Sequence, residues 1–184
     1  MADLANARVL ILATDGFEES ELFDPRQALL DAGATVTLAS IGTDPIQGVV
    51  GDSEPARKIT PDLTLDDVDT EQFDLLLLPG GVANPDKMRM QERAVEIVGE
   101  FMDDGKIVAA ICHAPWLLVE ADVVDGRRVT SWPSVRTDLE NAGADVVDEE
   151  VVVDDNLITS RKPDDIPAFS RAIIDALETA LTDA

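Results

Sequence analysis

Two adjacent residues, Cys112 and His113, combine a nucleophile with a proton carrier, and each is the only residue of its type in the chain. They follow an apolar run at residues 107–111 and precede Ala114 and Pro115 in the sequence IVAAICHAPW. A short, fully apolar run predicts a buried strand of a parallel sheet. Pro115 suits the first turn of a following helix, where its missing N–H costs nothing. We therefore expect Cys112 at a strand-to-helix turn, a nucleophile elbow.

The predicted elbow favours the thiolate of Cys112, which is the reactive form of the side chain. A helix start directs unpaired N–H groups and the positive end of its dipole at the sulfur, so we expect a pKa below the usual ~8.5. His113 is the expected proton carrier. Neighbours on a regular helix point about 100° apart, so we expect the two side chains to cooperate through the substrate. The alternative is that Cys112 is a small buried hydrophobe.

Strands and helices are predicted to alternate around the elbow. Apolar strands are expected at residues 8–13, 35–39, 73–78 and 107–111, and helices at about 18–32, 84–104, from 115 and from 164 or 165. Shorter elements are expected at 42–58 (a loop or small hairpin), 63–68 (one helical turn), 128–131 and 145–147 (strands), 135–141 (a helix) and 150–160 (a hairpin). This order predicts one domain over residues 1–184 with a doubly wound α/β sandwich. Ligands bind such a fold at the carboxyl edges of its strands, where residues 14–18, 79–81 and 112–113 would converge.

The charge of the chain excludes a nucleic-acid-binding role. Its 38 acidic residues outnumber 14 basic ones and give a formal charge of −24, whereas affinity for nucleic acid comes from neutralising phosphates. The chain is nevertheless 45% hydrophobic, so we expect the acids to cover the surface of a folded domain. An acidic, lysine-poor surface is typical of proteins from salt-accumulating halophiles.

The same composition predicts a cytoplasmic protein without a metal or other cofactor. One cysteine cannot form an intrachain disulfide, and no Cys/His cluster has the spacing of a metal site. No stretch reaches the ~20 apolar residues of a membrane span. The segment MADLANARVLILATDG has an acid before its apolar run and only Arg8 as a basic residue, unlike a secretory leader.

Six segments together resemble one known family. They are DGFEESEL, LLLPGG, AICHAP, GRRVTSWP, NAGADVVDEEVVVDDNLITSR and PDDIPAF. They are similar to the PfpI-type intracellular protease branch of the superfamily that includes the Parkinsonism-associated deglycase, and the match spans nearly the whole chain. This resemblance implies a flavodoxin-like fold with a mostly parallel central sheet. Ala114 departs from it, because many relatives have Gly there.

The resemblance also implies roles for four residues around the elbow. Cys112 corresponds to the family's nucleophile, and His113 corresponds to its adjoining histidine. Gly80 and Gly81 correspond to the glycines whose N–H groups hold an oxyanion. Apart from these four residues, Trp132-Pro133 is expected to line the site; the alternative is that Trp132 belongs to the core or to an interface.

The resemblance places on Glu18 the acid that hydrogen-bonds the thiolate. Such an acid must be protonated at least part of the time, since an ionised carboxylate raises the pKa of a nearby thiol. We expect Glu19 and Glu21 to matter less than Glu18.

A further acid, Asp86, is expected to act from a neighbouring subunit. In the PfpI branch an acid near the start of this helix completes a Cys-His-acid triad across a subunit interface. The resemblance thus implies a homo-oligomer, a dimer or a hexamer built from dimers, in which Asp86 supports His113. The alternative is an ordinary acid at a helix start.

These residues predict a cysteine-dependent, stress-protective enzyme that acts on reactive carbonyls or glycation adducts, as the family's glyoxalases and deglycases suggest. The Cys112 thiolate would add to an aldehyde such as methylglyoxal, and His113 or Glu18 would move the proton through an enediolate. The nearest alternative is an intracellular cysteine peptidase or amidase that works through a thioester. A third is a redox-sensing holdase chaperone. His113 favours an enzyme, because sensing does not require it.

We predict that stability rises with salt. Like charges on a −24 chain repel one another, and the screening length falls from ~10 Å at about 0.1 M salt to ~3 Å at about 1 M. Melting temperatures should therefore be several degrees higher in about 2 M potassium chloride than in dilute buffer. Melting curves that coincide in the two media would contradict a halophilic surface.

Overall fold

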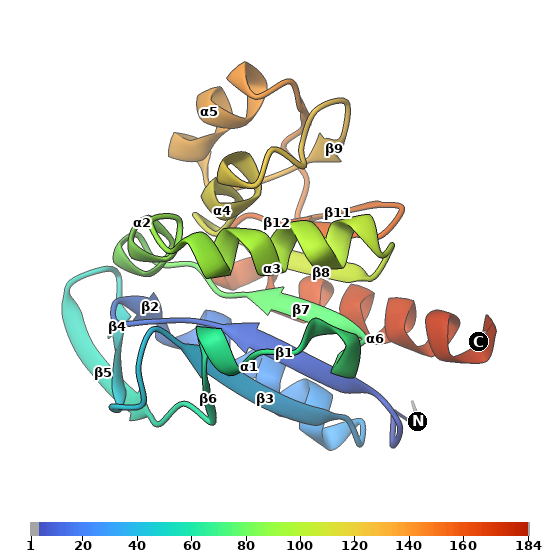
Figure 1. Cartoon of the computed structure of the whole chain (residues 1–184). Coiled ribbons are helices and arrows are strands. Elements are labelled where there is room, and N and C mark those ends of the chain that lie inside the picture. Colours follow the sequence, from blue (N-terminus) through green and yellow to red (C-terminus); the bar gives the residue numbers. More distant parts are fainter. Residues whose placement is uncertain (1–3, 184) are drawn as a thin grey trace.

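The structure is a computed structural model that describes residues 4–183. Residues 1–3 and residue 184 lie outside the described part. The segment that was compared with a secretory leader begins with these first three residues. A seven-stranded sheet runs through the molecule with helices on both sides (Figure 1). Its strands in spatial order are β11 (Val151–Asp154), β12 (Leu157–Ser160), β8 (Ile107–Ile111), β7 (Leu75–Leu78), β1 (Arg8–Leu12), β3 (Thr35–Ser40) and β6 (Leu63–Thr64). Only β11 pairs antiparallel, so the predicted α/β sandwich with a mostly parallel sheet is confirmed.

The central strands are apolar throughout because both faces of the sheet are covered. Successive residues of β1 enter opposite cores: Val9 and Ile11 face one side, and Leu10 and Leu12 face the other. The first side is covered by α1 (Glu19–Asp31) and α6 (Ile166–Asp183). The second side is covered mainly by α3 (Glu92–Asp103), α4 (Pro115–Glu120) and α5 (Arg136–Asn141). None of the helices between residues 4 and 183 is both long and apolar enough to cross a membrane.

The expected helix over residues 84–104 is wrong, because two helices occupy it. These are α2 (Ala83–Met88) and α3, with a break at residues 89–91. Asn84 is not a helix cap. Its buried amide donates to the carbonyls of Pro79 and Gly80, and its oxygen accepts the N–H of Thr14 at 2.8 Å. Asn84 therefore ties the end of β7 to the end of β1, two strand edges that meet at the site.

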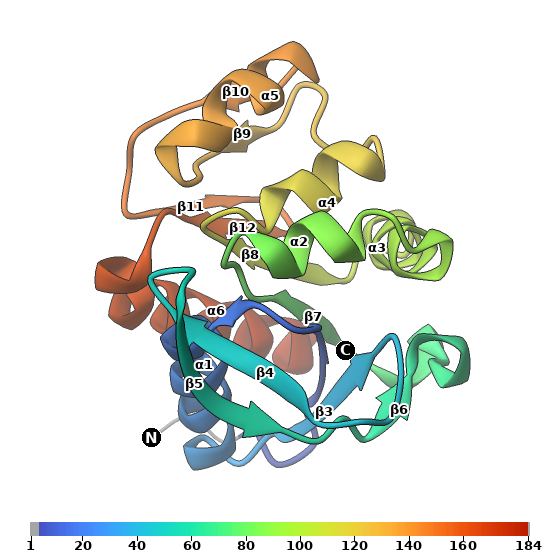
Figure 2. The same cartoon turned by 90° about the vertical axis from the view of Figure 1, so that its left-hand side faces the viewer.

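A small sheet of β2 (Phe17–Glu18), β4 (Ile46–Val50) and β5 (Glu54–Ile59) stands beside the main one, and Figure 2 shows β4 and β5 in front of the central sheet. The expected hairpin at 42–58 is thus confirmed as β4 and β5. Gly48 is needed where β4 crosses Phe17, because a Cβ there would lie 2.9 Å from the ring. The turn of this hairpin, at residues 51–53, reaches the carboxyl edge of the main sheet.

The remaining short elements follow the sequence pattern. The single turn expected at 63–68 is a 3-10 helix, η1 (Leu65–Asp67), and the hairpin at 150–160 is β11 and β12. The other pieces are η2 (Thr70–Gln72), β9 (Arg128–Val129), η3 (Pro133–Val135), β10 (Asp145–Val146) and η4 (Pro163–Asp165). β9 and β10 form a separate parallel pair. The chain between them forms η3 and α5, and α5 lies beside α4, the helix that follows the elbow.

Candidate active site

Cys112 lies in a tight turn between β8 and α4. Its φ of 64° is in the left-handed region, which non-glycine residues rarely adopt. Two hydrogen bonds hold this conformation: its N–H donates to the Ser160 carbonyl at 3.1 Å, and its carbonyl accepts the Trp132 N–H at 2.9 Å. The side chain is 6% exposed. The turn therefore presents the sulfur at the carboxyl edge of the sheet but keeps it almost out of water.

His113 contacts the thiol directly. Its Nδ1 lies 3.2 Å from the Cys112 Sγ, so the expectation that the pair meets only through substrate is wrong. The left-handed turn at Cys112 breaks helical geometry and brings the two adjacent side chains together. The imidazole stacks on Trp132, with ring centroids 5.7 Å apart, and also packs against Trp116. Its Nε2 lies 3.3 Å from the Ser134 Oγ.

The two contacts of the imidazole let it carry a proton in either direction. Burial lowers the pKa of His113 and favours the neutral ring, which has one N–H. With Nδ1 protonated, the ring donates to a thiolate and Nε2 accepts from Ser134. With Nε2 protonated, Nδ1 accepts from the thiol and Nε2 donates to the same hydroxyl. Both forms are satisfied, because a hydroxyl can donate or accept.

Glu21, not Glu18, is the acid beside the thiol. Glu18 ends the extended strand β2, and its Oε2 accepts the Gly51 N–H at 2.9 Å, so it is committed to the hairpin. Glu21 lies one turn further on, in α1, where it is fully buried and accepts the Gly80 N–H at 3.0 Å. Its carboxyl acts on Cys112 through both charge and hydrogen bonding. The assignment of Glu18 is therefore wrong, and Glu21, expected to matter less, takes its place.

Burial dominates the ionisation of this pair. It raises the pKa of Glu21 to about 8, and the hydrogen bonds from the thiol and from Gly80 offset only part of the effect. Burial and the charge of Glu21 also raise the pKa of Cys112, while the N–H groups of Gly81 and His113 lower it. This direction is opposite to the one expected from the helix start alone. Because the charge of Glu21 raises the pKa of Cys112, the thiolate is favoured only while Glu21 holds its proton.

The two glycines after β7 have different roles. Gly80 leaves room for other groups, because a Cβ there would overlap the Glu21 carboxyl and the Cys112 side chain. Its N–H is bonded to Glu21, so the expectation that it holds an oxyanion is wrong. Gly81 has a φ of 76°, and its N–H points at the sulfur together with that of His113. These two N–H groups are the donors that face the nucleophile.

Asp86 does not reach the site within one chain. It is exposed on α2, and its side chain makes no hydrogen bond or ion pair in the part of the chain that the structure describes.

Another acid that sequence reasoning missed, Asp52, lies in the hairpin turn with a φ of 66° and accepts the Val82 N–H at 2.9 Å. Its charge acts on His113 and offsets part of the effect of burial on the pKa. A Gly-Asp turn signals such a conformation, but only the fold shows that it faces the histidine.

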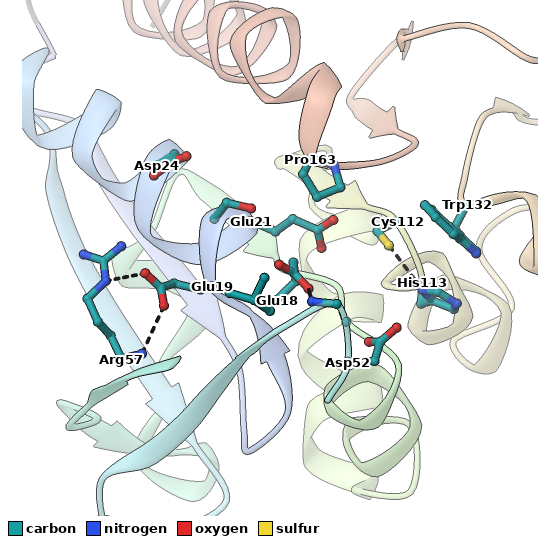
Figure 3. A pocket seen from close by; sticks show the side chains of 14 residues that line it. Glu18, Glu19, Glu21, Asp24, Asp52, Arg57, Cys112, His113, Trp132 and Pro163 are labelled. Carbon is teal, nitrogen blue, oxygen red and sulfur yellow. Dashed lines mark hydrogen bonds and ion pairs between the residues drawn. The ribbon is translucent and has the colours of Figure 1, made fainter. Parts of the chain in front are cut away.

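A cavity of about 590 Å³ opens over the thiol (Figure 3). Cys112 and His113 stand on one side, and the acids of β2, α1 and the hairpin stand on the other. Trp132 and Pro163 close its rim. The cavity is lined by Glu18, Glu19, Ser20, Glu21, Asp24, Val50, Gly51, Asp52, Arg57, Gly81, Cys112, His113, Trp132 and Pro163. Its floor is therefore a buried nucleophile with a proton carrier on each side, one imidazole and one carboxyl.

Comparison with known proteins places this arrangement in a family. The model of the DJ-1/PfpI family matches residues 7–176. General stress protein 18 of Bacillus subtilis is 45% identical over 93% of this chain and 98% of its own length. Deglycase PYRAB04690 of Pyrococcus abyssi is 43% identical over 93% and 99% of the two chains. The crystal structure of Drosophila melanogaster DJ-1beta superposes with a TM-score of 0.85, at 31% identity over 97% and 91%, which agrees with the flavodoxin-like fold.

Replacing Glu21 by Gln should simplify the pH dependence of Cys112 alkylation by iodoacetamide. The parent protein should show two steps, because ionised Glu21 opposes loss of the second proton. Glutamine keeps a similar shape but carries no charge. Burial still raises the thiol pKa, but the contribution of the Glu21 charge is removed, so the thiolate should form in one step below the parent's second step. Alkylation rates between about pH 5 and about pH 11 check this.

Glu18→Gln is the matched control for this measurement. Because Glu18 is bonded to Gly51 in the hairpin, its replacement should leave both steps of the profile in place. A profile that becomes simple in Glu18→Gln and stays unchanged in Glu21→Gln would restore the assignment made from the sequence.

Proposed function

Because the chain belongs to the DJ-1/PfpI family, we propose that it is a cysteine-dependent, stress-protective enzyme that acts on reactive carbonyls or on glycation adducts. The names of its relatives, a general stress protein and a deglycase, support this proposal. The observation that carries it is the contact of Cys112 with His113 at 3.2 Å beside the buried Glu21. A nucleophile between two proton carriers is what a proton shift next to a carbonyl requires.

Methylglyoxal illustrates the proposed steps. The Cys112 thiolate attacks the aldehyde carbon, the C–S bond forms, and the carbonyl electron pair moves to the oxygen. The N–H groups of Gly81 and His113 stabilise this oxyanion, and Glu21 supplies the proton that gives a hemithioacetal. Loss of the proton on that carbon forms an enediolate, and protonation of the neighbouring carbon gives a thioester. Water then releases lactate and returns the thiol.

The imidazole suits the two proton transfers between carbons. His113 Nδ1 lies beside the sulfur to which the reacting carbon becomes attached, and burial keeps the ring neutral and able to accept a proton. Ser134 compensates either protonation state of the ring, so the ring does not need to turn between the two steps. Trp132, stacked on the imidazole, fixes its plane.

A glycation adduct can enter the same sequence. An aminocarbinol carries the former aldehyde carbon, already bonded to a hydroxyl and to an amine nitrogen. Attack by Cys112 forms the C–S bond, the C–N bond breaks, and the protonated amine leaves. The product is the same hemithioacetal. The cavity of about 590 Å³ exceeds what methylglyoxal needs and has room for the side chain that carries an adduct.

A peptidase is the second candidate, and one observation favours it. A hollow of about 670 Å³ between α1 and α6 shares Asp24 and Pro163 with the cavity over the thiol. The two together give an extended depression, as peptide cleavage requires. In that reaction Cys112 would attack an amide carbonyl, and His113 would protonate the leaving amine.

Turnover of methylglyoxal by the purified protein tests the proposal. In about 2 M potassium chloride, lactate should accumulate, and Cys112→Ala should lower the rate at least a hundredfold because the covalent step is lost. Asp175→Asn, an exposed change on α6 far from the cavity lining, should turn over at the parent rate. Lactate is measured enzymatically, and a fluorogenic peptide is assayed in parallel.

The parallel assay separates the candidates. Cleavage of the peptide without lactate formation would replace the carbonyl reaction by the peptidase. Absence of both reactions, with peroxide oxidation of Cys112 and protection of a client protein from aggregation, would support the redox-sensing chaperone instead.

We also propose that the enzyme is a cytoplasmic homo-oligomer in which Asp86 acts across an interface. Its exposure on α2 leaves it accessible to a neighbouring chain. Cys112→Ala and Asp86→Ala oligomers should each be weakly active or inactive. After dissociation in low salt and reassembly of an equal mixture, roughly a quarter of parent activity should return for a two-fold dimer, since half the assemblies are mixed and each has one whole site.

The matched control is a mixture of Cys112→Ala with His113→Ala. These two residues touch within one chain, so this mixture should recover nothing. No recovery in the Asp86 mixture, with subunit exchange confirmed by mass spectrometry, would leave Asp86 as a surface acid.

A further inference from the structure

The cavity over Cys112 is lined by five carboxyl groups and one basic side chain. The acids are Glu18, Glu19, Glu21, Asp24 and Asp52, and the base is Arg57. An excess of one charge in a partly enclosed site concentrates the field on whatever binds there. The partners of each group decide how much of this charge a ligand meets.

The charge of Arg57 is already neutralised. Its Nε lies 2.6 Å from the Glu19 Oε1, and its guanidinium packs on the Phe23 ring at 3.9 Å from the ring centre. The ion pair and the ring contact fix this guanidinium at the wall. Arg57 and Glu19 thus contribute little net charge to the cavity.

Three of the acids have no basic partner. Glu18, Asp24 and Asp52 form no ion pair within residues 4–183. Glu18 and Asp52 accept only neutral backbone N–H groups, from Gly51 and Val82. Asp24 is exposed on α1 at the rim. A ligand in the cavity therefore faces three uncompensated carboxylates.

A buried oxygen at the floor is also without a partner. Glu21 is 0% exposed and lines the cavity, yet its Oε1 has no hydrogen-bond partner in the described chain. A buried carboxyl oxygen of this kind is costly unless a ligand supplies a hydrogen-bond partner. This oxygen independently points to a bound molecule that presents a hydroxyl or an N–H group next to the thiol.

We infer that this site selects carbonyl adducts that carry a positive charge, an ammonium or guanidinium group, over neutral and anionic ones. The inference rests on the proposed function for its reaction and on the cavity walls for its selectivity. The reacting carbon sits at Cys112, the hydroxyl of the adduct meets the free oxygen of Glu21, and the cation extends toward Asp52 and Asp24. An anionic substrate meets the same carboxylates and is repelled.

The charge preference can be measured without turnover, by the rate at which methanethiosulfonates modify Cys112. In this reaction the thiolate takes the thioalkyl group as a disulfide and methanesulfinate leaves. We compare the cationic trimethylammonioethyl reagent with the anionic sulfonatoethyl reagent, each divided by its rate with 2-mercaptoethanol. The cationic reagent should be about tenfold faster in dilute buffer, and the ratio should shrink in about 1 M potassium chloride.

Single substitutions locate the source of the preference. Asp52→Asn and Asp24→Asn should each lower the ratio two- to threefold, and asparagine at position 52 tolerates the left-handed turn. Asp175→Asn removes the same charge from the exposed face of α6 and should leave the ratio unchanged. Equal normalised rates for the two reagents would overturn the inference. An equal response to all three substitutions would overturn it as well, because the rate preference would then come from the net charge of the molecule and not from the cavity.

Turnover of three matched hemithioacetals completes the test. Methylglyoxal adducts of thiocholine, 2-mercaptoethanol and 3-mercaptopropionate share the reacting carbon and differ in charge; in each, Cys112 forms the new C–S bond while the bond to the small thiol breaks and that thiol leaves with a proton. The kcat/KM should fall about tenfold from the cationic to the anionic adduct in dilute buffer. Equal values would refute the charge selection and keep the proposed function. Turnover of none, with the reagent ratio intact, would refute the proposed function and the substrate class while the cation-attracting cavity stands.

Discussion

A buried carboxyl and a buried thiol that cannot both be ionised constrain the rest of the site. Two charges at this depth would repel each other with little water to screen them, so Glu21 and Cys112 carry at most one negative charge between them. Each surrounding group helps to place that charge on sulfur or on oxygen. The N–H group of His113 favours the thiolate, that of Gly80 favours the carboxylate, and that of Gly81 favours the ionised form of either group. The reactivity of the nucleophile is thus a balance set by backbone donors from two strand ends.

This balance depends on close approach of three elements. The absence of a side chain at Gly80 lets α1, β7 and the elbow meet, because a Cβ would occupy the space of both reacting groups. Asn84 holds the loop after β7 against the end of β1 from the other side. The strained turn at Cys112 is kept by hydrogen bonds to Ser160 and Trp132, which belong to segments far along the chain. Packing of the whole sheet therefore maintains the geometry of one sulfur atom.

Local patterns in the sequence were sufficient for the elbow and for most elements, but not for the break between α2 and α3. The run IVAAI and Pro115 mark a strand end and a helix start, and both features act over a few residues. Which of Glu18 and Glu21 lies beside the thiol is not decided by the residues close to them in the sequence. Both are acids in DGFEESEL, and only the point where β2 becomes α1 decides which one turns inward. Asp52 and Ser134 likewise reach His113 through the folding of a hairpin and a distant turn, which spacing along the chain does not encode.

The small sheet of β2, β4 and β5 builds one wall of the cavity apart from the sheet that carries the nucleophile. Its hairpin supplies Gly51, Asp52 and Arg57 to the cavity but pairs with none of the strands that carry the nucleophile. Changes in the length or charge of this hairpin therefore alter the cavity wall without breaking a pairing of the seven-stranded sheet. The same hairpin also acts on His113 through the charge of Asp52, so substrate preference and proton transfer are linked through one appendage.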